Sequence, residues 1–156
     1  MRVLSIDPGY GRCGVAVLEK EGGKERLVYS ACIETPPTAD FPLRLSAVTN
    51  ECVRLLKKYR PDAVALERLY LAKNKKTAMR VAEIRGALIG AAANAKVPIF
   101  EYSPGEVKSA VAGFGKADKR AIIKMLHVLL TIEKKIAYDD EYDAIAVGVT
   151  HLARSR

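Results

Sequence analysis

The chain has 156 residues, of which 49% are hydrophobic and 28% are charged. This balance is typical of one globular domain, spanning residues 1–156, and excludes a disordered protein. Lysine and arginine outnumber aspartate and glutamate by 26 to 18, and the formal net charge of +8 favours a polyanionic partner, either nucleic acid or an anionic membrane surface. No apolar run reaches the length of a membrane span and no basic-then-apolar leader opens the chain, so we expect a cytoplasmic protein.

Three apolar segments near the N-terminus predict three strands joined by short turns. They cover residues 2–6, 13–18 and 26–33. Strands joined in this way pair antiparallel. If Gly22 and Gly23 are the two turn residues, the register places Cys13 opposite Cys32, close enough for a bridge, although cytosolic thiols normally stay reduced.

The rest of the chain alternates between helical and strand patterns. Strands are predicted over 62–66 and 97–102, and helices over 42–59, 75–95, 103–113, 117–130 and from 139 or 140 to about 153. The crossovers between the later strands require parallel pairing. We therefore expect an α/β fold, a five-stranded mixed sheet whose first three strands are antiparallel, with helices on both faces.

The helix predicted over 75–95 is apolar on nearly every side of its second half. One face can pack on the sheet, and the face that remains is rich in small residues and needs another cover. Either the chain's own helices or a second subunit can supply that cover.

Carboxylates stand at the ends of the predicted strands. Asp7 comes where the first strand stops and Glu67 follows the buried fourth strand, while Asp140 and Asp143 share a face in the first turn of the last helix. Because ligand sites in such sheets gather at the carboxyl ends of strands, these acids are expected to converge. A cluster of this kind can hold Mg²⁺, and a pair of ions suits in-line displacement at a phosphodiester. Asp139, four residues before Asp143, could face the cluster in place of Asp140.

Each acid also has a structural interpretation. Asp7 precedes Pro-Gly and is typical of a turn. The acids of residues 139–143 suit the positive end of a helix dipole. Glu67 is harder to explain in this way, because a charge after a buried strand has few solvated positions. The combination of these acids in a basic chain favours a nuclease.

Two groups of cations accompany the acids. The first surrounds Tyr70 and consists of Arg68, Lys73, Lys75, Lys76 and Arg80. The second consists of Lys116, Lys119, Arg120 and Lys124. A solvated charged face is one interpretation. The other is a surface that follows phosphates, with Tyr70 stacking on an exposed base.

At this point the residues match a family: over essentially its full length, the chain resembles the RuvC family of bacterial Holliday-junction resolvases, which have an RNase H-like fold. The matching segments are residues 5–9 (SIDPG), 65–68 (ALER), 73–74 (KN), 140–144 (DEYDA) and 150–151 (TH). The segments 107–108 (VK) and 115–119 (GKADK) are similar to the basic stretches of the family. As an ordered set these motifs are specific.

The resemblance implies roles for individual residues. The implied metal ligands are Asp7, Glu67, Asp140 and Asp143, the implied phosphate-facing catalytic lysines are Lys108 and Lys119, and the implied DNA-contacting residues include Tyr70, Lys73 and Asn74. The acid-x-x-Asp-Ala spacing of the family favours Asp140 over Asp139.

The resemblance also implies a function. The implied protein is a Mg²⁺-dependent endonuclease that resolves four-way DNA junctions, and Mn²⁺ can substitute for Mg²⁺. It is implied to act as a homodimer paired through the helix at 75–95. The branch-migration proteins RuvA and RuvB are the implied partners. Two other functions stay open: an RNase H-like nuclease that acts on RNA, and a junction-binding protein without activity.

Overall fold

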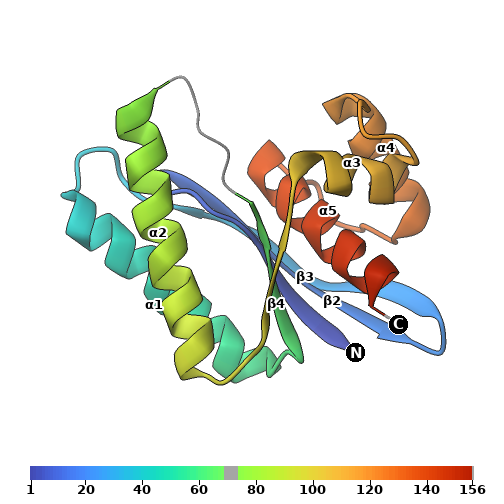
Figure 1. Cartoon of the computed structure of the whole chain (residues 1–156), viewed down its shortest axis with the longest axis horizontal. Coiled ribbons are helices and arrows are strands. Elements are labelled where there is room, and N and C mark those ends of the chain that lie inside the picture. Colours follow the sequence, from blue (N-terminus) through green and yellow to red (C-terminus); the bar gives the residue numbers. More distant parts are fainter. Residues whose placement is uncertain (69–73, 156) are drawn as a thin grey trace.

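A computed structural model of the chain describes residues 1–68 and 74–155 (Figure 1). Its strands are β1 (Arg2–Asp7), β2 (Arg12–Glu21), β3 (Lys24–Glu34), β4 (Ala63–Glu67) and β5 (Ile99–Tyr102). Its helices are α1 (Phe41–Tyr59), α2 (Lys75–Asn94), α3 (Pro104–Ala112), α4 (Lys119–Leu129) and α5 (Asp139–Arg154). The predicted order of elements is confirmed. None of the helices in these two ranges is both long and apolar enough to cross a membrane.

The five strands form one sheet in the order β3-β2-β1-β4-β5. The pairs β1–β2 and β2–β3 are antiparallel, and the pairs β1–β4 and β4–β5 are parallel. This is the predicted mixed sheet. Its parallel part brings the carboxyl ends of β1 and β4 to the same edge.

The predicted pairing of Cys13 with Cys32 is wrong. The β2–β3 turn does lie at Gly22 and Gly23, but the register shifts between Val17 and Leu18, so that Cys32 stands opposite Gly14. A bulge adds one residue to one strand and moves every later pair by one position. The three cysteines of the chain are free thiols.

Helices cover both faces of the sheet: α1 and α2 lie on one side, and α5, with α3 and α4 beside it, lies on the other (Figure 1). Successive strand residues point to opposite faces. On β4, Val64 and Leu66 enter the core beneath α1 and α2, while the smaller Ala63 and Ala65 enter the core beneath α5. Small residues on that face allow α5 to lie close to the strands.

Only one face of α2 is covered by the described part of the chain. The buried residues are Ala78, Ile84, Leu88 and Ala92. The opposite face, formed by Met79, Ala82, Gly86, Gly90 and Ala93, is exposed. The described part of the chain therefore buries the sheet-facing side of α2 and leaves the opposite face uncovered.

Candidate functional site

Asp7 and Glu67 lie next to each other at the carboxyl end of the sheet. They are the last residues of the paired parallel strands β1 and β4. Because side chains alternate along a strand, Asp7 points to the same face as Val3, and Glu67 to the same face as Ala65. Val3 and Ala65 both belong to the core beneath α5. The alternation thus turns both acids towards the helix that carries the other predicted ligands.

The first turn of α5 approaches β2 very closely. A Cβ atom on Gly14 would lie only 1.7 Å from the carbonyl oxygen of Asp140, so this strand position requires glycine. Asp140 lies 3.6 Å from the Arg12 guanidinium, and the Asp139 side chain is 65% exposed and 3.8 Å from Lys119. Gly14 was not among the residues predicted for the site, although a glycine inside a strand signals such an approach.

A cavity of ≈ 190 Å³ opens between the strand ends and helices α3, α4 and α5. Four of the predicted site residues line it: Glu67, Lys108, Lys119 and Asp143. Two caps fix the helices around it. Ser103 and Glu106 form a reciprocal capping box at the start of α3, and Asp118 accepts a hydrogen bond from the Ala121 amide at the start of α4.

The carboxylates in and beside this cavity have raised pKa values, first through burial and then through the charge of neighbouring acids. The pKa of Asp7 is raised to about 8: burial is the largest cause, the charges of Glu67, Asp143 and Asp140 add to it, and the charge of Lys119 opposes it. Burial also raises the pKa of Glu67, with Asp143 as the next cause, and burial raises the pKa of Asp143. Asp140 therefore belongs to the same electrostatic group as Asp7.

Lys119 is the cation closest to these acids. Its Nζ donates a hydrogen bond to Asp143 Oδ2 at 2.8 Å. Burial opposes its charge, but the hydrogen bond to Asp143 and the charges of Asp143, Asp139 and Asp7 together raise the pKa of Lys119. The ammonium group therefore stays protonated at neutral pH. Its charge also acts on Asp7, but burial and the charges of Glu67, Asp143 and Asp140 outweigh it there.

The residues fit a divalent cation by their chemistry. Carboxylate oxygens are the ligands that hard cations prefer, and acids with mutually raised pKa values gain most from added positive charge. Within residues 1–68 and 74–155, no three acidic, histidine or cysteine side chains already enclose a common point as metal ligands. The assignment of Asp7, Glu67, Asp140 and Asp143 as ligands therefore remains a prediction.

The predicted DNA-contacting residues come from two stretches of the chain, 68–80 and 116–120. Tyr70 and Lys73 fall outside the described residues. Asn74 caps α2 by accepting hydrogen bonds from the Lys76 and Thr77 amides. Arg80 packs over the Phe41 ring at 4.0 Å and is 3.1 Å from Glu83.

The remaining basic candidates are Arg68, Lys75, Lys76, Lys116 and Arg120, and all of them are exposed. Exposure leaves these five charges accessible to phosphate groups from outside.

A second polar cluster at the start of α5 escaped the sequence analysis. Glu141 is 5% exposed and accepts a hydrogen bond from Ser30 Oγ at 2.6 Å. The Lys134 Nζ lies 2.5 Å from the same carboxylate and 2.6 Å from the Ser30 carbonyl oxygen. The cluster joins the α4–α5 connection and α5 to β3. No sequence signal could have indicated it, because Ser30 is 111 residues from Glu141 and 104 residues from Lys134 along the chain.

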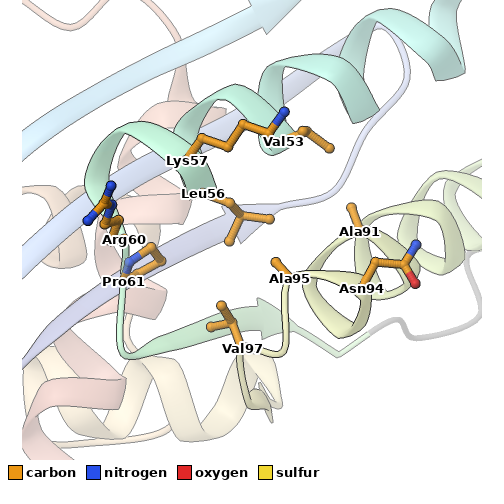
Figure 2. Close-up of a pocket in the computed structure, with 9 residues that line it drawn as sticks. All are labelled: Val53, Leu56, Lys57, Arg60, Pro61, Ala91, Asn94, Ala95 and Val97. Atoms are coloured by element: carbon orange, nitrogen blue, oxygen red, sulfur yellow. The ribbon is translucent and has the colours of Figure 1, made fainter.

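A larger cavity, of ≈ 490 Å³, lies between the C-terminal ends of α1 and α2 (Figure 2). Its lining consists of Val53, Leu56, Lys57, Arg60, Pro61, Ala91, Asn94, Ala95 and Val97. None of these residues is an acid, and Arg60 points away from the others in Figure 2. It lies near the start of β4, whereas the carboxylates lie at its end. This larger cavity therefore lacks the carboxylates that a metal site requires.

Comparisons with known proteins place this arrangement in a family. The family model for the crossover junction endodeoxyribonuclease RuvC matches residues 3–151. The chain belongs to the RuvC family. The RuvC crossover junction endodeoxyribonuclease of Thermosipho melanesiensis is 42% identical over 148 residues, which are 95% of this chain and 94% of the relative.

Solved RuvC structures have the same fold. The Thermus thermophilus RuvC structure superposes with a TM-score of 0.89 at 31% identity, covering 98% of this chain and 94% of the other. The structure of T. thermophilus RuvC in complex with a Holliday junction substrate superposes with a TM-score of 0.90, covering 97% and 93% of the two chains. The RuvC fold in this chain thus includes the strand ends, the cavity and the helices around them.

Proposed function

We propose that this chain is a structure-selective endonuclease that resolves four-way DNA junctions by paired cuts during recombination and repair. One observation carries the proposal. In a basic member of the RuvC family, half-buried carboxylates from β1, β4 and α5 converge beside a cavity at one edge of the sheet. T. thermophilus RuvC, whose structure with a Holliday junction has a TM-score of 0.90 against this chain, supports the choice of substrate.

The proposed metal ligands are Asp7, Glu67, Asp140 and Asp143, and the proposed metal is Mg²⁺. When bound, Mg²⁺ activates a water for in-line attack and stabilises charge on the phosphate, which leaves 5′-phosphate and 3′-hydroxyl ends. Asp7 provides a carboxylate from the sheet side and Asp143 provides one from α5. The raised pKa values of both acids support this assignment, because a cation would relieve their repulsion.

Lys108 and Lys119 are the proposed phosphate-facing lysines. They line the cavity from α3 and α4, on the side opposite Glu67. Lys119 is held by Asp143 at 2.8 Å and keeps its proton. A fixed ammonium group near the scissile phosphate stabilises negative charge that develops during displacement.

The two cation groups are proposed to hold the arms of the junction by their phosphates. The group after Glu67 continues onto the first turns of α2, and the second group surrounds the start of α4, where Lys119 lines the cavity. Tyr70 is proposed to stack on a base next to the cut. Affinity carried by phosphate contacts falls as salt rises, because bound counterions are released.

A homodimer is proposed as the active unit, with the exposed face of α2 as the seam. Two symmetric cuts in one junction require two sites related by a two-fold axis, which a closed dimer provides. The described chain leaves Ala82, Gly86 and Gly90 uncovered on that face, which supports the choice. RuvA and RuvB remain the partners implied by the family, residues 1–156 are proposed to be one nuclease domain, and the compartment implied by a DNA substrate is the cytoplasm.

The decisive experiment is incubation with a mobile synthetic four-way junction, with and without Mg²⁺. We expect paired nicks that give two ligatable duplexes, only with the metal. An RNA–DNA hybrid of the same length and a linear duplex serve as controls. Preferential cleavage of the hybrid would favour an RNase H activity instead. Tight junction binding with no nicking at any Mg²⁺ or Mn²⁺ concentration would indicate a binding protein without activity.

A further inference from the structure

Phe114 is a large aromatic side chain exposed next to the candidate active site. It lies in the connection between α3 and α4 and is 56% exposed. It belongs to neither core, and in the described ranges it has no aromatic or cation–π partner. Phe41, by contrast, packs against Tyr10 and Arg80. The fold therefore does not account for the ring at position 114.

The backbone on both sides of Phe114 is anchored. Gly113 ends α3 with a positive φ of 85°, and its amide donates a hydrogen bond to the Ser109 carbonyl oxygen. A Cβ atom on Gly115 would lie 3.3 Å from Ser109 Oγ and 3.6 Å from the Gly105 carbonyl oxygen, so the connection folds back onto α3. These contacts fix the backbone on both sides of the exposed ring.

The same connection leads directly into the cavity wall. Ala117, Asp118 and Lys119 line the cavity that contains Glu67 and Asp143. Ala117 also donates a backbone hydrogen bond to the Phe114 carbonyl oxygen at 3.4 Å. The ring is therefore attached within a few residues of the phosphate-facing lysine.

The surroundings of Phe114 favour nucleic acid over protein as its partner. Lys116, Lys119 and Arg120 follow within six residues and are all exposed. An exposed ring among cations is the combination that binds DNA through base stacking and phosphate contacts. A protein-binding surface is instead depleted of lysine and surrounds its aromatic anchor with apolar area.

We propose that Phe114 is a second base-contacting aromatic of this enzyme, and that it stacks on an unpaired or end-stacked base of the junction on the α3–α4 side of the cavity. The proposal rests on the proposed function, since its ligand is the junction. It adds a ring in the α3–α4 connection to the base contact already proposed for Tyr70. Stacking recognises any base, so the contact contributes to junction shape and not to sequence choice.

The test uses the full-length protein and a four-way junction with 2-aminopurine at each position around the exchange point, in EDTA to prevent cleavage. Because Tyr70 is also proposed to stack on a base, we expect wild-type binding to change the fluorescence at more than one position, and Phe114→Ala to lose the change at one of them while keeping the others. Junction affinity should fall about 5- to 150-fold, the range for one lost base stack. Phe114→Trp should retain both properties.

Two controls separate stacking from folding and from charge. Val128 is a 70% exposed apolar residue at the other end of α4, and Val128→Ala should change nothing. The unfolding midpoint of Phe114→Ala should equal that of the wild type. Phe114→Ala should keep the wild-type slope of log affinity against log salt, whereas Lys116→Ala should reduce the slope by about one.

Wild-type affinity and fluorescence in Phe114→Ala would overturn the proposal while leaving junction resolution intact. Unchanged DNA binding combined with weaker self-association would also overturn it, since the ring would then contact protein. A wild type that neither binds nor cuts the junction would refute the proposed function, and this outcome is distinct from the first two.

Discussion

Two carboxylates near the N-terminal end of α5 are withdrawn from solvent, but their neighbours differ. Glu141 accepts a hydrogen bond from Ser30 and lies 2.5 Å from the Lys134 ammonium group. Asp7 faces other carboxylates, and its pKa is raised to about 8. An acid that is paired with a cation of the chain is part of the fold, whereas an acid that faces other acids is stabilised by a proton or by a cation from outside. Burial alone would not have separated the two.

Replacing Asp7 by asparagine tests the acid that faces other acids, and we expect it to have the largest effect on activity. The amide keeps the shape but loses the charge that a metal requires. Changes to groups that only orient a ligand cost 10- to 100-fold, so we expect nicking to fall by more than about 100-fold. Junction affinity in EDTA should stay near wild type. Near-normal nicking by Asp7→Asn would remove Asp7 from the ligand set.

Asp7→Asn should lose activity, but without metal it should be more stable than the wild type at high pH. The folded state raises the Asp7 pKa from 3.8 to about 8, so it binds this proton more tightly than the unfolded state does. The metal-free wild type therefore loses stability as pH rises from about 4 to about 8, and Asp7→Asn should flatten that loss. Urea denaturation at several pH values, with EDTA, measures it. An unchanged slope would show that Asp7 titrates normally.

The α2 helix extends the comparison from charges to apolar surface. Leu88 is 1% exposed and packs in the core beneath α2, so Leu88→Ala should cost about 2–5 kcal/mol in the free energy of unfolding. Ala82 lies on the exposed face, so Ala82→Asp should leave the fold intact and separate the proposed dimer. Sedimentation at micromolar concentration gives the oligomeric state. A monomeric wild type that still makes paired cuts would contradict the two-fold argument.

Much of this arrangement could be predicted from local patterns. The alternation of strands and helices indicated the sheet, and the acids at the ends of β1 and β4 indicated the site, because parallel strands bring their carboxyl ends together. The register of Cys32 could not be predicted, since a bulge between Val17 and Leu18 moves every later pair. Gly14 and Glu141 also escaped prediction, because their roles depend on where α5 meets β2 and β3.

Removing the partner of Glu141 tests the acid that is paired within the chain. Lys134→Met leaves a carboxylate that is 5% exposed without its ammonium group. Because Lys134 itself is 48% exposed, we expect a moderate loss of stability, about 1–3 kcal/mol. Nicking by the folded protein should be retained. Glu141→Gln in the same background should recover stability, since the amide has no charge to leave unpaired. A gain in stability from Lys134→Met alone would contradict this account.

His151 is a second buried polar side chain with partners in the chain, and its replacement has the smallest expected effect on stability. It is 2% exposed, its Nδ1 lies 2.9 Å from the Tyr102 hydroxyl, and its Nε2 lies 3.2 Å from Ser155 Oγ. Burial lowers the pKa of His151 below 6.5, so the folded state binds this proton less tightly than the unfolded state does. Its contribution to stability is therefore complete above pH 6.5 and is lost as pH falls below that value.

The other histidine of the chain is a matched control for this prediction. His127 is exposed in the last turn of α4, where its Nε2 lies 2.9 Å from the Tyr142 hydroxyl. Denaturation between pH 5 and 8 should show a loss of stability on acidification that disappears in His151→Gln and persists in His127→Gln. If both variants keep the wild-type profile, other groups carry the pH dependence. Since His151 joins α5 to β5 far along the helix from the carboxylates, its replacement should leave the Mg²⁺ requirement for nicking unchanged.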